Sequence, residues 1–325
     1  MKNCNKNKHD KLDFSLRPKK LEDFVGQENV KNNLKVFIAA SKKRNEPLDH
    51  CLFFAPSGLG KTTLSYIIAK EMGGNLKITS GPTIEKIGDL AAILSNLKVG
   101  DVFFIDEIHR MVPTVEESLY SVMEDFQLDI MIGKGPSAKT IKLPIPQFTL
   151  IGATTRAGLI SNPLRNRFGI IEHLDFYSIK ELQYIVKRSA TLINIDIDEE
   201  ASKEIAKRAR GTPRIVNRLL KRVRDFADIK DCKISKNIAV EALNSLDIDT
   251  AGLNRIDRLI LKILLEKFDG GPVGIKTIAT ILSEDLETVT DIYEPYLIKL
   301  GFISRTSRGR IITNEGKQHI KNNNN

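Results

Sequence analysis

The fold of this chain is decided by Phe54-Ala55-Pro56-Ser57-Gly58-Leu59-Gly60-Lys61-Thr62-Thr63. An apolar run at residues 51–54 predicts a buried strand before this stretch, and apolar residues from 64 to 69 predict a helix after it. In such a strand–loop–helix, glycines let successive backbone N–H groups face a phosphate, and the helix N-terminus adds positive potential. The stretch therefore predicts a phosphate-binding loop, with a plain glycine-rich turn as the alternative.

Individual residues of the loop have separate expected roles. Lys61 is expected to reach the β- and γ-phosphates of ATP, and the Thr62 hydroxyl to ligate Mg²⁺. One departure from the usual pattern is Ala55, which replaces the first glycine and costs stability if that position needs a positive φ. The residues that we expect to hold the phosphates are Gly58, Gly60, Lys61, Thr62 and Thr63.

An acidic pair downstream adds hydrolytic chemistry to the phosphate loop. The short apolar run at residues 102–105 predicts a strand buried on both faces, and Asp106 and Glu107 follow at its carboxyl end. Asp106 can hold Mg²⁺, and Glu107 can activate a water for attack on the γ-phosphate. A strand-ending Asp-Glu is by itself often an ordinary solvated strand end, but together with the loop it predicts ATP hydrolysis.

Composition limits the remaining classes of protein. The chain has 325 residues, which predicts two or three domains, and its formal charge of +9 suits an anionic partner. The 3 cysteines lack CxxC spacing, which indicates a reducing, cytoplasmic setting and argues against disulfides or zinc. The chain has no apolar run of about 20 residues, so we expect no membrane span, and its N-terminus does not read as a secretory signal.

Hydrophobic periodicity divides the chain into parts. Alternating helix and strand patterns predict an α/β domain with a parallel sheet, and an unbroken series of helical patterns after it predicts an all-α domain. A helix–helix–helix–hairpin order then predicts a winged helix. The predicted parts are a disordered basic arm at 1–15, the α/β domain at 16–178, the all-α domain at 179–250, the winged helix at 251–320 and a disordered tail at 321–325.

Strands and a hairpin are expected within the α/β domain. Two β-rich arms around Gly133-Lys134-Gly135-Pro136-Ser137 predict a hairpin at residues 128–145, which projects from the sheet. The predicted sheet strands are residues 51–54, 76–79, 102–105, 148–152 and 170–174.

Three further polar residues are candidates for the site. Thr154 follows strand 148–152, where it can touch the attacking water and the γ-phosphate or simply cap a helix. Arg167 is either a surface charge or, in a ring of subunits, an arginine finger that serves a neighbour's ATP. Arg214 opens a helix in the all-α part, and from there it can fold onto the phosphates.

Charge changes sign within the predicted winged helix. Its third helix is acidic, with Glu284, Asp285, Glu287, Asp291 and Glu294. The hairpin that follows is basic, with Arg305, Arg308 and Arg310. An acidic helix repels phosphates, so we expect DNA to be bound through its backbone by the three wing arginines, with little dependence on sequence. A solvated basic hairpin is the alternative.

Several segments together resemble the AAA+ ATPases of the RuvB family, the Holliday-junction branch-migration motors. The resemblance runs from Leu16 to Gly316, and it departs from the family at Ala55, Ser57 and Leu286. The segments that carry it include Gly58-Leu59-Gly60-Lys61-Thr62-Thr63, Phe104-Ile105-Asp106-Glu107-Ile108-His109-Arg110, Glu124-Asp125-Phe126-Gln127-Leu128, Gly152-Ala153-Thr154-Thr155-Arg156 and Arg165-Asn166-Arg167-Phe168-Gly169.

The resemblance implies site roles. Thr154 is implied as the first sensor of the nucleotide, Arg214 as the second, and Arg167 as the finger that reaches the neighbouring subunit. It also implies that the all-α part is an AAA+ lid. Further residues that it places beside the nucleotide or at the seam between subunits are Leu16, Arg17, Glu124, Asp125, Phe126 and Tyr177.

The resemblance also implies an activity and partners. The activity is that of a homohexameric motor that depends on ATP and Mg²⁺. This motor would move duplex DNA and drive Holliday-junction branch migration in recombination, DNA repair and the SOS response. Hairpin 128–145 would bind RuvA, with Ile141 and Leu143 as anchors, and RuvC would join in a resolvasome.

A different class stays open on the residues alone. A DNA-bound AAA+ switch, such as a replication initiator or a clamp-loader subunit, uses ATP mainly to control assembly. Hairpin 128–145 and a wing without a base-reading helix argue against it. A degenerate ATPase kept as a scaffold is disfavoured because Lys61, Asp106, Glu107 and Arg167 are all present.

Overall fold

The computed structural model describes residues 16–132 and 139–323, and these residues form two compact units. The first unit runs to Ala55 and continues from Leu59 to Asp175. The second unit takes the three residues Pro56–Gly58 together with the chain from Phe176 onward. The phosphate loop therefore divides between the two units.

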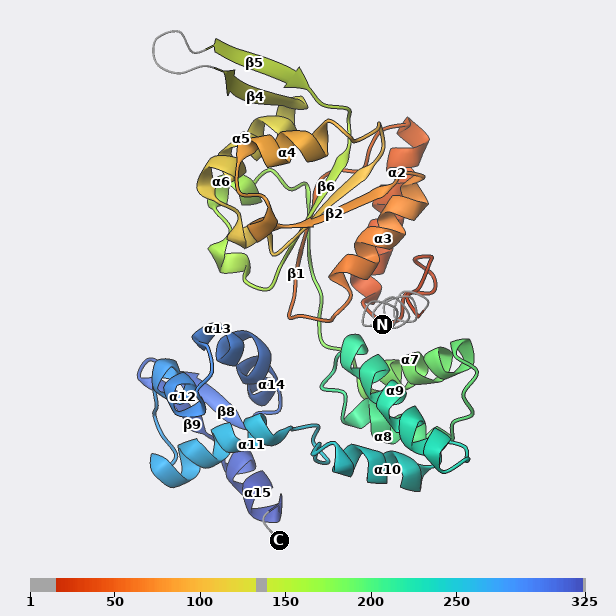
Figure 1. Cartoon of the computed structure of the whole chain (residues 1–325), viewed down its shortest axis with the longest axis vertical. Coiled ribbons are helices and arrows are strands. Elements are labelled where there is room, and N and C mark those ends of the chain that lie inside the picture. Colours follow the sequence, from red (N-terminus) through yellow and green to blue (C-terminus); the bar gives the residue numbers. More distant parts are fainter. Residues whose placement is uncertain (1–15, 133–138, 324–325) are drawn as a thin grey trace, which may run out of the picture. The chain divides into compact units, whose positions relative to one another are not determined.

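A five-stranded parallel sheet forms the centre of the first unit, as predicted (Figure 1). Its order is β2-β3-β6-β1-β7, so that β6 lies between β1 and β3. The residues of β6 and nearly all residues of β1 and β3 are buried, which fits strands covered on both faces. The strands are β1 (Cys51–Phe54), β2 (Leu76–Ser80), β3 (Val102–Asp106), β6 (Thr149–Thr154) and β7 (Ile170–His173).

Helices cover both faces of this sheet (Figure 1). On one side, α4 and α5 pack into a core that contains Leu52, Phe103 and Leu150 of the strands. On the other side, α3 packs on β3 and α2 packs on α3. The helices are α2 (Glu28–Arg44), α3 (Lys61–Met72), α4 (Ile87–Leu94), α5 (Pro113–Asp125) and α6 (Asn162–Arg165), with short 3-10 turns η1 (Gly81–Thr83), η2 (Ile108–Arg110) and η4 (Ala157–Leu159).

Strand β6 is the main difference between prediction and structure within the sheet. The apolar pattern predicts residues 148–152, whereas the ladder continues to Thr154, which pairs with Phe54. A hydrogen bond from the Ala55 N–H to the Thr154 carbonyl, at 3.1 Å, extends the pairing further. Thr154 is thus a strand residue, and the alternative that it caps a helix is wrong.

His50 joins three elements of the first unit. Its Nδ1 accepts the Leu150 N–H at 2.9 Å, so the ring proton is on Nε2, which donates to the Met123 carbonyl at 3.1 Å. Burial lowers the pKa of His50, against the opposing effects of the Met123 contact and of Asp49. His50 directly precedes β1. Its neutral ring therefore links the start of β1 to β6 and to the end of α5.

The two arms of the hairpin predicted at residues 128–145 form a separate antiparallel pair. Strands β4 (Gln127–Ile132) and β5 (Lys139–Pro144) extend from the end of α5 (Figure 1). The predicted turn at residues 133–137 lies outside the described residues. Leu128 is buried in the core at the base, while farther out Met131 is 73% exposed and Ile141 is 50% exposed.

The second unit begins with four helices, as the periodicity predicts. Ser178 starts α7 with a capping box to Glu181, and Pro213 opens α9 at a position where its missing N–H costs nothing. Each helix buries one face. The helices are α7 (Ile179–Leu192), α8 (Glu199–Lys207), α9 (Pro213–Ile229) and α10 (Lys236–Ser245).

A winged helix follows in the same unit, in the predicted order. Its helices are α11 (Arg255–Lys262) with a π turn η5 (Ile263–Lys267), α12 (Ile275–Leu282), α13 (Leu286–Thr288), a π turn η6 (Val289–Tyr293) and α14 (Glu294–Lys299). Strands β8 (Ile303–Thr306) and β9 (Gly309–Ile312) form the wing, and α15 (Asn314–Asn323) ends the described chain.

Two features of the winged helix differ from the sequence expectation. The third helix, predicted as continuous over residues 286–300, contains the π turn η6 just before Pro295, whose missing N–H and bulky ring disfavour a regular α turn there. Helix α15 continues through residue 323, into the tail predicted as disordered from 321. It is anchored because Ile320 is buried and His319 stacks on Phe302.

A buried ion pair connects the four-helix part to the winged helix. Arg210 donates to both carboxylate oxygens of Asp257, at 3.0 and 3.1 Å, and to the Ile292 carbonyl at 3.3 Å. Its guanidinium carbon also lies 4.7 Å from the centre of the Tyr296 ring. Burial raises the pKa of Asp257 despite the nearby arginine. Bidentate geometry of this kind fixes the orientation of both partners.

Acid should destabilise the first unit through His50. Burial holds the folded pKa below the ordinary value of 6.5, so the unfolded chain binds more protons once the pH falls below that value. Stability is then lost as the pH falls, by at most about 1.4 kcal/mol per pH unit. We expect the urea midpoint of the wild type to drop more than that of His50→Gln between about pH 7.5 and about pH 5.5. Equal drops would contradict the neutral folded ring.

Candidate nucleotide and DNA sites

The phosphate loop has the backbone geometry that its glycines predict. Gly58 and Gly60 adopt φ values of 85° and 109°, which residues with a side chain rarely adopt. A Cβ on Gly58 would also lie 2.8 Å from Cγ2 of Thr212, so this position needs glycine for space as well. Gly60 ends the loop directly before α3, whose N-terminal N–H groups are available to an anion.

Ala55 does not strain the loop. It is absent from the residues with positive φ, so the backbone at this position does not require glycine. Its carbonyl accepts a hydrogen bond from Nζ of Lys61 at 2.6 Å. Lys61 is itself buried at the start of α3 and is held across the loop, while Thr62 and Thr63 follow in the first turn of that helix.

Asp106 and Glu107 stand at the carboxyl end of β3, as predicted. Asp106 is the last residue of the strand and pairs with Ser80 of the edge strand β2. Glu107 adopts φ 48°, a left-handed conformation that is uncommon for a residue with a side chain, and its N–H donates to Oδ1 of Asp106 at 3.1 Å.

Thr155 is a contact of Glu107 that the sequence analysis missed. Its hydroxyl donates to Oε2 of Glu107 at 3.3 Å. Thr154, the predicted first sensor, is fully buried, and its Oγ1 accepts the Arg156 N–H at 2.9 Å. The signal was available in the sequence, since two consecutive threonines end a strand beside the acidic pair.

Arg167 is fixed in place within its own unit. Its Nε forms an ion pair with Oε1 of Glu124 at 3.2 Å, and one terminal nitrogen donates to the Pro163 carbonyl at 2.8 Å. Its guanidinium lies 4.5 Å from the centre of the Tyr120 ring. The structure thus brings together Glu124 and Arg167, two residues that the resemblance placed at the seam between subunits.

The other predicted nucleotide residues are distributed over the two units. Leu16 is buried and Arg17 half-buried in the first unit, and Asp125 is exposed at the end of α5. Tyr177, in the second unit, is buried, and its N–H donates to the Gly211 carbonyl at 2.9 Å.

Phe126 has a packing role that its predicted place near the nucleotide does not require. It ends α5 with φ 53° and lies edge-on to Phe148, with ring centres 6.0 Å apart, and near His50, at 6.2 Å. It is one of the partly buried residues against the core of the first unit. These contacts make Phe126 part of the hydrophobic packing of the first unit.

Arg214 contacts the part of the phosphate loop that belongs to the second unit. Its backbone N–H donates to the Gly58 carbonyl at 3.4 Å, and a terminal guanidinium nitrogen lies 3.4 Å from Oγ of Ser57. A second sensor needs a cation beside the phosphate loop. Both contacts are long, and the role of Arg214 as a second sensor stays a prediction.

Glu294 corrects the expected charge pattern of the winged helix. It is not part of an acidic surface, because it is only 1% exposed and faces the wing. Arg310 Nε donates to it at 2.6 Å, and Arg305 Nε donates at 3.1 Å. Burial alone would raise the pKa of Glu294, but its bonds to the two guanidiniums outweigh burial and lower it. Arg308 does not take part in this pairing and is exposed in the turn between β8 and β9.

The hairpin anchors differ from each other in exposure. Ile141 is half-exposed opposite Ile130, whereas Leu143 is partly buried against the core of the first unit, opposite Leu128. Met131, which the sequence analysis did not select, exposes more of its side chain than either. Ile141 and Met131 are therefore the better candidates for a contact outside the chain.

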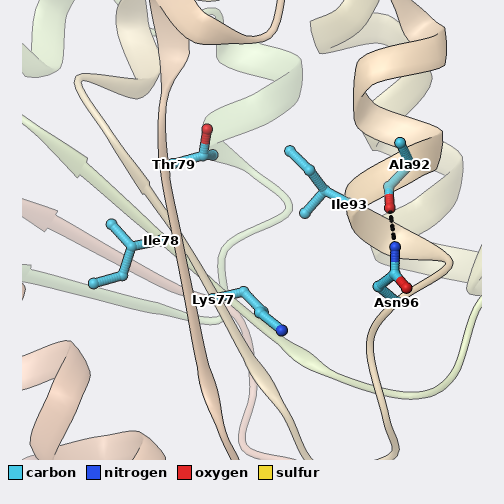
Figure 2. A pocket seen from close by; sticks show the side chains of 6 residues that line it. All are labelled: Lys77, Ile78, Thr79, Ala92, Ile93 and Asn96. Atoms are coloured by element: carbon cyan, nitrogen blue, oxygen red, sulfur yellow. Dashed lines mark hydrogen bonds between the residues drawn. The ribbon is translucent and has the colours of Figure 1, made fainter.

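A shallow hollow of about 400 Å³ lies elsewhere in the first unit (Figure 2). None of the predicted site residues lines it, so it is not the nucleotide site. Its walls come from the edge strand β2 and from α4 with the residues after it, namely Lys77, Ile78, Thr79, Ala92, Ile93 and Asn96.

Among the described residues, no helix is long and apolar enough to cross a membrane, and no three potential ligands gather into a metal site.

Comparison with known proteins covers nearly the whole chain. Residues 16–174 match the family described as the Holliday junction DNA helicase RuvB P-loop domain. Residues 177–249 match the RuvB AAA lid domain, and residues 250–321 match the RuvB C-terminal winged helix domain.

Solved structures give the same result. The structure titled as the Thermotoga maritima RuvB Holliday junction branch migration motor has a TM-score of 0.88 and 50% sequence identity, covering 94% of this chain and 98% of its own. Two single-residue mutants of that protein match with the same identity and coverage and with TM-scores of 0.88 and 0.87. With a P-loop α/β domain, an AAA lid and a winged helix in this order, the chain belongs to the RuvB family of Holliday-junction branch-migration motors.

Proposed function

We propose that this chain hydrolyses ATP and uses the energy to move duplex DNA and drive Holliday-junction branch migration. The observation that carries the proposal is the register of three parallel strands. Phe54 pairs with Thr154, and Ile105 pairs with Gly152, so the phosphate loop, Asp106–Glu107 and Thr154 all follow from neighbouring strand ends. Ligands of open α/β sheets bind at this carboxyl edge.

The residues at this edge suit ATP hydrolysis. Lys61 and the N–H groups at the start of α3 bind the phosphates, and Glu107 accepts a proton from the attacking water. Helix α3 packs on β3, so the Thr62 hydroxyl and the Asp106 carboxylate belong to adjoining elements, and both are oxygen donors that suit Mg²⁺. The bound ion would neutralise charge on the phosphates.

We propose that the working form is a homohexamer in which Arg167 serves the ATP of the neighbouring subunit. Its ion pair with Glu124 and its contact with Tyr120 hold the guanidinium on the surface of α5, and these three side chains are all partly exposed. A rigid arginine on the outside of the unit suits a role in trans, because little ordering cost remains when the neighbour binds.

We propose that the wing binds the phosphate backbone of DNA through Arg308, Arg305 and Arg310. Arg305 remains about half exposed while paired with Glu294, so it can share its charge with a phosphate. Arg310 is 18% exposed and holds the wing in shape through the same glutamate. Backbone contacts of this kind carry no sequence information, which suits a motor that moves along DNA.

We propose that the hairpin β4–β5 binds RuvA through Ile141 and Met131, with Leu143 supporting Ile141 from below. Exposed apolar side chains on a projecting hairpin are an aggregation risk unless a partner covers them. Association with RuvC, roles in DNA repair and the SOS response, and a cytoplasmic location complete the proposed assignment.

Substitutions at Lys61 and Glu107 separate binding from hydrolysis. We expect Lys61→Ala to weaken binding of a fluorescent ATP analogue, because it removes the charge that faces the phosphates. Glu107→Gln should bind nucleotide normally but turn over at least about 100-fold more slowly, because the amide cannot accept the proton of water. Steady-state turnover of Glu107→Gln near that of the wild type would refute the role of this carboxylate.

Mixed rings test the role of Arg167 in trans. Arg167→Ala and Glu107→Gln should each lack hydrolysis alone. In an equal mixture, about a quarter of the sites combine an intact Glu107 with an intact Arg167 from the neighbour, and activity should return to that extent. The measurement is ATPase activity of mixtures whose mixed composition is verified by native mass spectrometry. No recovery in verified mixed rings would mean that Arg167 acts within its own subunit.

Substitutions in the wing separate DNA contact from folding. Arg308→Ala should weaken binding equally for two unrelated duplexes and lower the slope of log affinity against log salt by about one. Lys321→Ala removes one exposed charge from α15 of the same fold and serves as the control, with the slope unchanged. Arg310→Ala should instead lower the thermal midpoint, because buried Glu294 loses a partner. A loss confined to one duplex would indicate base readout.

A further inference from the structure

His109 lies between two residues that have proposed roles in hydrolysis. Its Nδ1 is 2.9 Å from Oγ1 of Thr154, the proposed first sensor, and 3.3 Å from Oε2 of Glu107, the proposed base. The ring belongs to the short turn η2 that directly follows Glu107, and its side chain is only 6% exposed. One nitrogen atom thus contacts both groups.

The surrounding hydrogen bonds determine where the proton of this ring lies. An ionised Glu107 can only accept hydrogen bonds, so an unprotonated Nδ1 would place its lone pair against Oε2. With the proton on Nδ1, the ring donates to Oε2 of Glu107 and to Oγ1 of Thr154, and both contacts are favourable. The geometry therefore selects the Nδ1–H form.

This proton position also determines what Thr154 can do. Its Oγ1 already accepts the Arg156 N–H at 2.9 Å, and the His109 Nδ1–H occupies the second lone pair. The hydroxyl proton of Thr154 must then point away from both, and it is available as a donor to a phosphate oxygen or to water. Glu107 remains an acceptor, with Oε2 held by His109 and by Thr155 at 3.3 Å.

We propose that His109 is a positioning residue for ATP hydrolysis, one that makes Thr154 a donor and holds Glu107 as an acceptor through its Nδ1–H. The inference rests on the proposed roles of Glu107 and Thr154. It predicts that His109 affects the chemical step through these two residues and does not contribute to nucleotide binding.

The decisive comparison uses His109→Leu and His109→Asn. Leucine fills a similar volume without a donor, whereas the amide nitrogen of asparagine can occupy the place of Nδ1 and donate from it. We expect His109→Leu to lower kcat about 10-fold or more, with affinity for a fluorescent ATP analogue changed by less than about 2-fold. His109→Asn should recover most of kcat, and His109→Gln, whose amide suits the Nε2 position instead, should not.

If His109 and Thr154 act through one hydrogen-bond network, the losses of kcat caused by substituting each residue should not add. Thr154→Val should also lower kcat, and the double variant with His109→Leu should be little slower than the worse single variant. If His109→Leu does not fold, the comparison of His109→Asn with His109→Gln remains, since they are both polar and only the first keeps the donor in place. Losses in His109→Leu and Thr154→Val that multiply would overturn the coupling.

Glu107→Gln in the same assays separates this inference from the proposed function. If Glu107→Gln keeps turnover, the assignment of the base is wrong, and the role of His109 is lost with it. If Glu107→Gln is inactive while His109→Leu has nearly wild-type kcat, only the role of His109 is wrong. Equal kcat values for His109→Asn and His109→Leu would also overturn it, because the ring would then act through packing.

Discussion

The nucleotide site depends on the hydrogen bonding of β6 between β1 and β3. This pairing sets Thr154 opposite Phe54, and it places Gly152 opposite Ile105 just before the acidic pair. Side-chain direction alternates along a strand, so a slip of one residue would turn Thr154 away and bury a different face. The register is held by the pairing of β6 with β1 on one side and β3 on the other, and by His50, whose Nδ1 accepts the Leu150 N–H.

Buried polar groups also determine how the elements are arranged. His50 satisfies a backbone N–H of β6 and a carbonyl of α5, while Asp257 and Glu294 are each paired with arginines. An unpaired buried polar group is costly, so each of these contacts favours one arrangement over its neighbours. Apolar packing supplies most of the stability, whereas these groups determine which elements meet.

The sequence predicted most of the fold because its strongest signals are local. Apolar runs located all five strands of the parallel sheet, the loop and the acidic pair followed from short motifs, and the winged helix followed from the order of its helical and β patterns. The errors lie where a distant residue decides the outcome. Thr154 belongs to β6 because of Phe54, and Glu294 is buried because two arginines of the wing cover it. Residue spacing alone shows neither relation, nor the contact of His109 with Thr154.

The buried pair of Arg210 and Asp257 has a mechanical consequence within the second unit. Arg210 binds Asp257 of α11. Only four residues later, the N–H of Arg214 donates to the Gly58 carbonyl of the phosphate loop. This short segment is therefore held at one end by the loop and at the other by α11. If Arg210 moved alone, it would leave a buried carboxylate without its partner, which costs about 3–5 kcal/mol. Displacement of the segment is thus cheaper when the winged helix moves with it.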